Sequence, residues 1–594
     1  MPLLRKLLLP LLVLSAALDA RAGSPKLATS ASAFIREQAG SPVDWQPWDE
    51  AVLRSAKDGG KPVYIFVGSM VNELSRATCR QSFANADTAA FLNKNFLCVI
   101  VDREEQPDVA ALAQHYLRTV KQLNNWPAHL WLTPDLKPFD GAGYLPPTEE
   151  WGKSSLLKIA QQVQAAWAAD AAGCRSRAGE AIAQLAPAAP ALVPGAAAPE
   201  KTRARLTAAA DLWRTGFDAA RGGFSEPPKA PEPELLRFLL RQSPADRAAA
   251  LTTLRAMAAS ALRDPLDGGF FHYVTDGGWR VPYLQKMLAD QARVALAYFD
   301  AAQGDDTQAF QAAGRGALDY ALTRLAQPDG TFAAAEDATA DEVAGYFVWT
   351  DAEIDAALGA EAAAFKTAHG VEAAGNVATD DDLSGKWKGK NFLRATLNPD
   401  AKDTAAAARL LAVRATRPAL PRDDRGTAGA HGLLLTALSR AGEPKYLEAA
   451  GRLFAAVQKQ FLLSPDGDLS HQRGSAVAGV PADYAALALG CREFARAAHR
   501  PEADALATKL LARLGAKFFD KASGHYYAVA AELPVGIFAR PPAIGEAPAA
   551  ESLSVLAGAP ADQVPLLVAG LWATVDEVAA PAAGDALLAL TPQP

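Results

Sequence analysis

Residues 61–75 read KPVYIFVGSMVNELS, and they decide the fold of the first part of the chain. The β-branched and aromatic run from residue 63 to residue 67 ends at Gly68 and predicts a buried strand. The next stretch, Ser69 to Arg80, lacks Gly and Pro and can form a helix. Apolar runs at residues 96–101 and 128–132 predict two more strands, and Trp126-Pro127 directly precedes the second of these runs. The segment therefore reads as an α/β domain.

This order of elements indicates a thioredoxin-like domain, in which a proline, usually cis, faces a Cys-x-x-Cys motif at the start of the helix. The corresponding residues of this chain are Asn72-Glu73-Leu74-Ser75. Dithiol exchange needs a thiolate to attack and a second sulfur to resolve the mixed disulfide. Asn72 and Ser75 can supply neither. We therefore interpret Asn72, Ser75 and Pro127 as a degenerate redox site.

Several motifs around this site resemble the spermatogenesis-associated protein 20 family. They are SPVDWQPW at residues 41–48, VDREEQPD at 101–108, NWP at 125–127 and LTPDLKP at 132–138. The resemblance implies a thioredoxin-like domain fused to a long helical domain, and it covers nearly the whole chain. Aligned without gaps, the two family cysteines fall on Asn72 and Ser75, and a family histidine falls on Arg76. The chain thus resembles a divergent, bacterial-type member that lacks the Cys-x-x-Cys.

The N-terminal residues 1–22 are typical of a signal peptide. Arg5 and Lys6 form a charged start, residues 7–18 an apolar core, and Ala20-Arg21-Ala22 a small-x-small cleavage signal. The core is shorter than the ~20 apolar residues that span a bilayer. We therefore expect a secreted, periplasmic protein with no membrane span after cleavage, and the alternative is an uncleaved N-terminal anchor.

The composition is that of a globular protein with an acidic balance. The chain has 594 residues, a hydrophobic fraction of 50% and a formal net charge of −7, which argues against a nucleic-acid partner. Its four cysteines are far apart in sequence, at positions 79, 98, 174 and 491, so their spacing nominates no disulfide. Cys79, about two helical turns beyond Asn72, is interpreted as a buried structural thiol. We expect neither a metal site nor a cofactor.

Repeated prolines separate two regions of different texture. The thioredoxin-like domain is predicted over residues 23–178, an Ala/Pro-rich linker over 179–200, and a helical domain over 201–594. The helical domain contains Ala/Leu-rich segments with helical spacing, among them residues 203–213, 234–240, 247–262, 284–302, 308–325, 432–441, 446–461 and 483–498. Between helices, Gly precedes an apolar residue in loops at 222–224, 268–270, 330–332, 467–469 and 524–526. This pattern favours an (α/α)6 toroid, the six-hairpin glycosidase-like architecture, over an open helical solenoid.

The loops at one mouth of such a toroid would carry its chemistry. Glycosidases need two carboxyl groups ~5–10 Å apart, and the candidate catalytic residues are Asp267, Glu336, Asp337, Asp424 and Asp483. Candidate binding residues are Trp279, Lys286, Asp290, Trp349 and His431. An epimerase would need bases on both sides of a carbon, for which the local histidines are His272, His431 and His471. The alternative for all of these residues is structural: helix caps, a Lys286–Asp290 pair and aromatic core plugs.

The family signature at this mouth is altered as well. The resemblance implies His at position 283 and Glu at position 285, where this chain has Tyr283 and Gln285. Three functions stay open: a binding or scaffold protein that grips an extended peptide or protein partner beside Pro127, a carbohydrate-binding or carbohydrate-processing toroid, and a single-thiol redox protein using Cys79. We favour the first of these, followed closely by the second.

Overall fold

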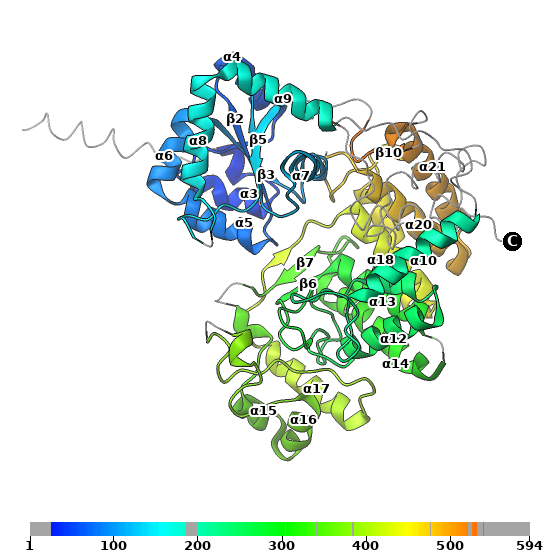
Figure 1. Cartoon of the computed structure of the whole chain (residues 1–594). Coiled ribbons are helices and arrows are strands. Elements are labelled where there is room, and N and C mark those ends of the chain that lie inside the picture. The colour runs from blue at the N-terminus through cyan, green and yellow to red at the C-terminus, as the bar shows by residue number, and fades with distance from the viewer. Residues whose placement is uncertain are drawn as a thin grey trace, which may run out of the picture. The chain divides into compact units, whose positions relative to one another are not determined.

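The computed structural model describes residues 25–150, 152–185, 199–302, 304–339, 343–382, 385–475, 477–520, 525–530 and 539. The predicted signal peptide lies outside these ranges, as does most of the predicted linker. The described residues fall into two compact units. The first unit runs to Leu185 and also contains the later residues 527–530 and 539, whereas the second contains the described residues from Pro199 to Tyr526 (Figure 1).

The first unit is built on a five-stranded sheet with the strand order β1-β3-β2-β4-β5. Its strands are β1 (Gln46–Pro47), β2 (Val63–Gly68), β3 (Leu97–Asp102), β4 (Ala128–Leu132) and β5 (Pro138–Ala142). Strands β1, β3 and β2 are parallel, while β4 and β5 join in antiparallel fashion. The three strands predicted from the apolar runs therefore lie side by side at the centre of this sheet.

Helices cover both faces of this sheet. They are α2 (Pro25–Ala28), α3 (Ala33–Glu37), α4 (Glu50–Gly59), α5 (Glu73–Ala77), α6 (Ala86–Asn95), α7 (Pro107–Lys121), α8 (Leu156–Ala169) and α9 (Ala171–Leu185), with short helical turns η1 (Gln38–Gly40) and η2 (Thr78–Phe83). Side chains alternate along a strand, so Tyr64 and Phe66 of β2 join one apolar core while Val63, Ile65 and Val67 join the other. The alternation explains why the whole of β2 is buried.

Residues 179–185, predicted as the start of the linker, continue helix α9, because the chain has no proline there before Pro187. At the other end of the predicted linker, Pro199 is the first residue of helix α10. The buried Val529 and Ala539 belong to the same apolar core as Ala181 and Leu185. A short segment after the helical unit is thus part of the first unit.

The second unit is a series of helical hairpins. Its main helices are α10 (Pro199–Thr215), α11 (Pro233–Leu239), α12 (Pro244–Ala258), α13 (Leu288–Ala301), α14 (Thr307–Tyr320), α18 (Ala428–Ala441), α19 (Pro444–Gln460), α20 (Pro481–Ala498) and α21 (Pro501–Phe518). Among these, α13 packs on α18 and α18 packs on α20, and each of the three also packs on the helix that follows it. These paired helices form the inner and outer members of successive hairpins. The predicted fold class, a thioredoxin-like domain followed by an all-α domain of the (α/α)6 class, is confirmed.

Helices α15 (Asp351–Leu358), α16 (Ala362–His369) and α17 (Ala401–Arg414) form a separate group. They share an apolar core of their own, which includes Trp349, Ile354, Phe365 and Leu410. Figure 1 shows this group apart from the hairpin helices. Because α13 packs directly on α18, the group is an excursion of the chain between two neighbouring hairpins.

Short strands and turns complete the second unit. A three-stranded sheet has the order β6-β7-β8 and consists of β6 (Gln285–Met287), β7 (Ala335–Asp337) and β8 (Arg422–Asp423), and β9 (Phe519–Asp520) pairs with β10 (His525–Tyr526). The helical turns are η3 (Gly304–Asp306), η4 (Ala321–Leu325), η5 (Ala344–Tyr346), η6 (Gly359–Glu361) and η7 (Thr379–Asp381). Strand β6 is why the helix expected from Leu284 begins at Leu288. In the described ranges, no helix is long and apolar enough to cross a membrane.

Candidate functional site

The degenerate redox site lies at one end of the central sheet of the first unit. In the β2–β4 register Val67 pairs with Ala128, which places Pro127 beside Gly68, where the chain leaves β2 toward Asn72. The Trp126–Pro127 peptide bond is cis. Asn72 is the N-cap of α5, and its Oδ1 accepts hydrogen bonds from the Ser75 backbone N (2.8 Å) and Oγ (2.9 Å). The two positions of the missing dithiol are therefore joined by a side-chain hydrogen bond.

An apolar surface borders this site. Leu74, between Asn72 and Ser75, exposes 41% of its surface. Met70, Val71 and Trp126 are half-buried. Leu74 is therefore an exposed apolar side chain between the two residues of the Asn72–Ser75 hydrogen bond.

A charged group covers part of the Trp126 ring. The Arg103 guanidinium lies 5.2 Å from the ring centroid. Its Nε donates a hydrogen bond to Glu104 at 2.6 Å. The Arg103–Glu104 ion pair therefore lies next to Trp126, the residue that precedes Pro127.

The four thiols of the chain lie outside the Asn72–Ser75 site. All four cysteines are free and buried. Burial raises the pKa of the Cys79 and Cys98 thiols and raises the pKa of Cys491 to about 12. Because the thiolate is the reactive form, Cys79 has the properties of a buried structural thiol.

In the second unit, the strands β6 and β7 bring candidate residues together on both faces of the small sheet. Gln285 pairs with Asp337, and Gln285 Nε2 donates a hydrogen bond to Asp337 Oδ2 at 3.2 Å. The neighbouring pair, Lys286 and Glu336, points to the opposite face, because side chains alternate along a strand. One face of the sheet therefore carries an amide–carboxylate pair and the other a buried ionic cluster.

The ionic cluster consists of Lys286, Asp264, Asp267 and Arg414, all of them buried. Lys286 Nζ lies 2.9 Å from Asp264 and 2.6 Å from Asp267, and Arg414 lies 2.6 Å from Asp264. Burial opposes ionisation of Asp264, but Arg414 and Lys286 outweigh it and hold the pKa of that carboxyl below its usual range. For Asp267, burial and the Asp264 charge raise the pKa. Lys286 thus binds these two carboxyls rather than forming the alternative pair with Asp290.

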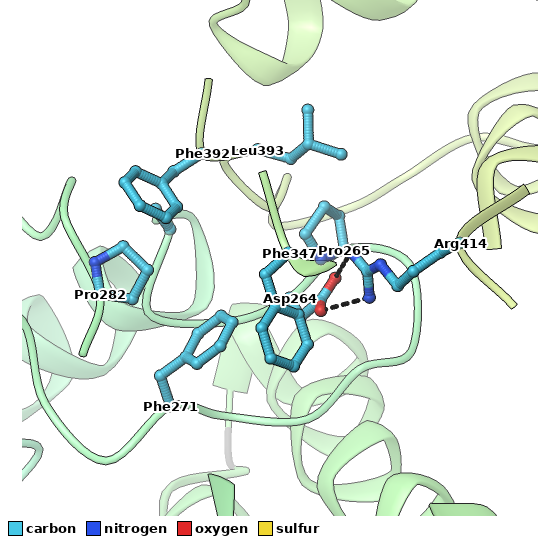
Figure 2. A pocket seen from close by; sticks show the side chains of 9 residues that line it. Asp264, Pro265, Phe271, Pro282, Phe347, Phe392, Leu393 and Arg414 are labelled. Carbon is cyan, nitrogen blue, oxygen red and sulfur yellow. Dashed lines mark hydrogen bonds and ion pairs between the residues drawn. The ribbon is translucent and has the colours of Figure 1, made fainter. Parts of the chain in front are cut away.

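A small hollow borders the cluster (Figure 2). Figure 2 shows the rings of Phe271, Phe347 and Phe392 around it, with the Asp264–Arg414 ion pair at its side. Arg414 Nε is buried and has no hydrogen-bond partner among the described residues. The hollow has room for about one water molecule, which could accept that hydrogen bond. The aromatic rings make the cluster a closed structural core, with no space for a sugar.

The remaining candidate acids are held by different neighbours. Glu336 accepts hydrogen bonds from Tyr320 Oη at 2.8 Å and Arg324 Nη2 at 2.8 Å. Asp337 also accepts from the backbone and side chain of Thr339. Both acids are engaged in the packing of the small sheet.

Asp483 acts within the start of helix α20. Its carboxylate accepts hydrogen bonds from the backbone N–H groups of Val480 (2.9 Å) and Gly429 (2.8 Å) and contacts His471 Nδ1 at 2.7 Å. Asp424 is exposed and lies 3.3 Å from Arg422. Of the five candidate acids, Glu336 and Asp267 share Tyr320 and Lys286 as neighbours, whereas Asp424 and Asp483 each have partners of their own.

Three of the candidate binding residues are packed into the core. The Trp279 indole donates to the backbone oxygen of Arg221 at 3.0 Å. Trp349 is fully buried, with the Arg417 guanidinium 4.1 Å from its ring centroid. His431 uses both ring nitrogens: Nδ1 donates to Thr427 O (2.7 Å) and Nε2 accepts from the Phe332 N–H (2.9 Å). Burial lowers the pKa of His431 to about 4, so this histidine is neutral near pH 7.

Of the other two candidate binding residues, Lys286 belongs to the ionic cluster and Asp290 contacts His272. The distance between Asp290 Oδ2 and His272 Nδ1 is 2.7 Å. Next to His272, the rings of Tyr273 and Tyr283 are stacked with centroids 4.6 Å apart. Sequence reasoning named His272, Asp290 and Tyr283 separately but not their grouping, since Asp290 is eighteen positions from His272. It missed Asp264 and Arg414 altogether. The Gly268 turn could have pointed to Asp264, whereas Arg414 lies 150 positions away and gives no local signal.

In the part of the chain that is described, no three His, Cys, Asp or Glu side chains gather in a way that could hold a metal ion. The fold and site thus define a thioredoxin-like protein without a dithiol, extended by helical hairpins. Residues 24–186 match the family model Thioredox_DsbH, described as a protein of unknown function, DUF255.

Relatives match over most of the chain. It is 28% identical to human spermatogenesis-associated protein 20 over 85% of this chain and 71% of that protein. The mouse protein is 30% identical, with 62% of this chain and 50% of its own length covered. An uncharacterized protein of Caenorhabditis elegans is 27% identical over 75% of this chain and 66% of its own length. The predicted resemblance is confirmed: the chain is similar to the spermatogenesis-associated protein 20 family over most of its length.

Solved structures similar to the chain include a GH76 α-mannanase of Bacteroides thetaiotaomicron, with a TM-score of 0.38 and 9% identity, covering 65% of this chain and 96% of the mannanase. A cellobiose 2-epimerase from Bacillus thermoamylovorans has a TM-score of 0.26 and 13% identity, covering 56% of this chain and 90% of the epimerase.

Proposed function

We propose that this chain is an exported binding protein whose thioredoxin-like unit holds an extended segment of a partner protein beside Pro127, without dithiol exchange. The observation that carries this proposal is the pair of hydrogen bonds from Ser75 to Asn72 Oδ1 at the positions of the missing cysteines. The site keeps its scaffold, with the cis Pro127, and loses only its redox groups.

The surface chemistry supports a protein partner. The exposed Leu74 and half-buried Trp126 offer apolar contacts, and Arg103, Glu104 and Glu73 offer charged ones beside them. Interfaces combine an apolar centre with a polar rim in this way. A bound segment would lie against Leu74 and Trp126 with its side chains in alternation, as extended peptides do.

Site-specific photo-crosslinking tests this proposal. A benzophenone amino acid is placed at position 74 in the exported protein, with Leu463 of the second unit, which is more exposed than Leu74, as the control position. We expect one partner protein to be captured at position 74, to be retained when all four cysteines are replaced by alanine, and to be lost with Trp126→Ala. Equal capture at positions 74 and 463, or loss of capture in the cysteine-free protein, would contradict the proposal.

Export by residues 1–22 forms part of this proposal and has its own test. Fusing these residues to alkaline phosphatase, which is active only in an oxidising compartment, should give active enzyme in the soluble periplasmic fraction. Activity that stays with the membrane would favour the uncleaved anchor instead.

A second function, binding of a carbohydrate by the helical unit, is supported by a different observation. The His272–Asp290 pair lies next to two stacked tyrosines, a combination of polar and aromatic groups that suits a sugar ring.

A further inference from the structure

Three loops of the helical unit are closed in the same way. In each loop a glycine has a positive φ angle, and the N–H two residues later donates a hydrogen bond to the fourth residue of an inner helix. The bonded pairs are Phe270 with Gln291 of α13 (2.8 Å), Phe332 with His431 of α18 (2.9 Å) and Leu469 with Tyr484 of α20 (3.1 Å). The loops are therefore structural repeats. Gln291, His431 and Tyr484 each accept the hydrogen bond that holds a loop against its helix, and this role is called the latch.

The same repeats carry a second pair of positions. Four residues after the glycine, the first and third loops have a histidine, and this histidine contacts the aspartate that is third in the following inner helix. The middle loop has Ala334 and Ala430 at these two positions. Since the middle loop closes without the pair, a His–Asp contact is not required to close a hairpin. Some other role must account for the contact where it occurs.

The two His–Asp pairs differ in their environment. His471 and Asp483 expose 9% and 3% of their side chains, and Asp483 also binds two backbone N–H groups. His272 exposes 42% of its side chain. Asp290 lies in the first turn of α13, a helix whose N-cap residue makes no side-chain capping bond. His471–Asp483 is thus a buried structural contact, whereas the His272–Asp290 pair is accessible at the surface through His272.

The surroundings of His272 offer the two kinds of contact that a sugar needs, an aromatic surface and hydrogen-bonding groups. Tyr273 stacks on Tyr283 at an interplanar angle of 11°, and the His272 ring meets Tyr273 edge-on at 5.4 Å. The backbone N–H of His272 donates a hydrogen bond to the backbone oxygen of Gln285 at 2.8 Å. On the far side of Gln285 lies the Asp337 carboxylate. Aromatic surface and hydrogen-bonding groups are therefore adjacent.

One buried atom at this place lacks a partner. Gln285 is fully buried, and its Oε1 accepts no hydrogen bond from the described residues. Buried acceptors are nearly always satisfied, so a buried water molecule is the donor that fits this closed place. The Gln285 side chain is therefore a support behind the surface of this region and does not contact solvent.

From these observations we infer that His272, Asp290, Tyr273 and Tyr283 form a binding site for a neutral saccharide. The tyrosine pair provides the surface for a sugar ring, and the His272–Asp290 pair binds its hydroxyl groups. The inference rests on the second function above and is independent of peptide binding at Pro127.

Isothermal titration with the neutral disaccharides cellobiose, mannobiose and chitobiose tests this site on the full exported chain. We expect one of them to bind, His272→Asn and Tyr283→Ala each to weaken binding at least tenfold, and His499→Asn to leave it unchanged. His499 is the matched control because it is exposed at the opposite end of helix α20. Circular dichroism confirms that each variant is folded.

The outcomes separate the two sites. The inference would be overturned if none of the three disaccharides bound. It would also be overturned if the His272→Asn and Tyr283→Ala variants bound as tightly as the wild type. Neither result affects photo-crosslinking at position 74. Conversely, failed crosslinking with retained disaccharide binding would overturn only the peptide-binding proposal.

Discussion

Asn72 and Ser75 are joined by hydrogen bonds at the two positions where related proteins are expected to carry a dithiol. Asn72 Oδ1 accepts from both the backbone N and the Oγ of Ser75, at 2.8 and 2.9 Å. The first bond caps helix α5, and the second satisfies the buried Ser75 hydroxyl. The start of helix α5 is therefore stabilised by hydrogen bonds between these two residues.

Restoring the dithiol tests whether the site geometry survives. The double variant Asn72→Cys/Ser75→Cys should form a disulfide on mild oxidation, because the two positions keep the Cys-x-x-Cys spacing at a helix start. We expect thiol titration in denaturant to find the four native thiols after oxidation and two more after reduction. When reduced, the variant should lose about 1 kcal/mol of stability with the Asn72 cap. Two extra free thiols after oxidation would show that the geometry is lost.

The Lys286 cluster should be critical for stability. Lys286→Met removes a cation that neutralises the buried Asp264 and Asp267, so we expect the free energy of unfolding to fall by about 3–5 kcal/mol. Lys445→Met is the matched control, because its ion pair with Asp319 is exposed and should contribute about 0–1 kcal/mol. Urea unfolding of both variants gives the comparison. Similar losses in the two variants would contradict a buried role for the cluster.

Sequence reasoning predicted the elements well where the signal was local. The β2 and β4 runs and the hairpin helices all depend on residues within one segment, whereas the cis Pro127 was implied by the resemblance. The candidate acids were chosen by residue type in loops, and the structure shows why that choice was weak. An aspartate at a helix start, such as Asp483, looks the same in sequence whether it caps, binds or reacts.

Long-range contacts could not be predicted. Arg414 reaches Asp264 across 150 positions, and only the packing of the α15–α17 group brings them together. The latch role of His431 required the repeat to be seen in three dimensions, since Gln291 and Tyr484 fill the same role with different side chains. The glycine repeat of these loops is visible in the sequence, but the chemically unlike residues that bond to them hide the shared contact.

The latch role of His431 leads to a pH prediction. Burial gives His431 a pKa of about 4, below the value of 6.5 for an exposed histidine. Between these values the unfolded chain binds more protons than the folded one, so stability falls as the pH falls from 6.5 to 4. His431→Gln, which copies the latch of Gln291, should remove about 3 kcal/mol of this loss.

The measurement compares unfolding free energies of the wild type and the His431→Gln variant at pH 7 and pH 4. We expect the two proteins to agree within about 1 kcal/mol at pH 7 and the variant to be the more stable at pH 4. The buried His129, with a pKa lowered by burial to about 3, is present in both proteins and cancels in the difference. If both proteins lost the same unfolding free energy between pH 7 and pH 4, His431 would not be a neutral latch.

The Gln285–Asp337 pair gives a prediction of the opposite sign. In Gln285→Glu, which restores the residue that the resemblance implies, a second carboxyl faces Asp337 in place of the amide donor. Burial and the like charge would raise the pKa of the new carboxyl. Stability relative to wild type should therefore be kept at pH 4, where protonated Glu can donate as Gln does, and fall by about 3 kcal/mol at pH 7.

A matched control separates burial from simple repulsion. Gln327 also donates to an aspartate, Asp424, but that pair is exposed to solvent. Gln327→Glu should change the unfolding free energy by less than about 0.5 kcal/mol at either pH, because water screens the repulsion. Thermal unfolding of both variants at pH 4 and pH 7 decides the matter. If Gln285→Glu were as stable as the control at pH 7, the two carboxylates would have to be separated by a rearrangement of β6 and β7, and the amide at position 285 would not be what keeps Asp337 in place.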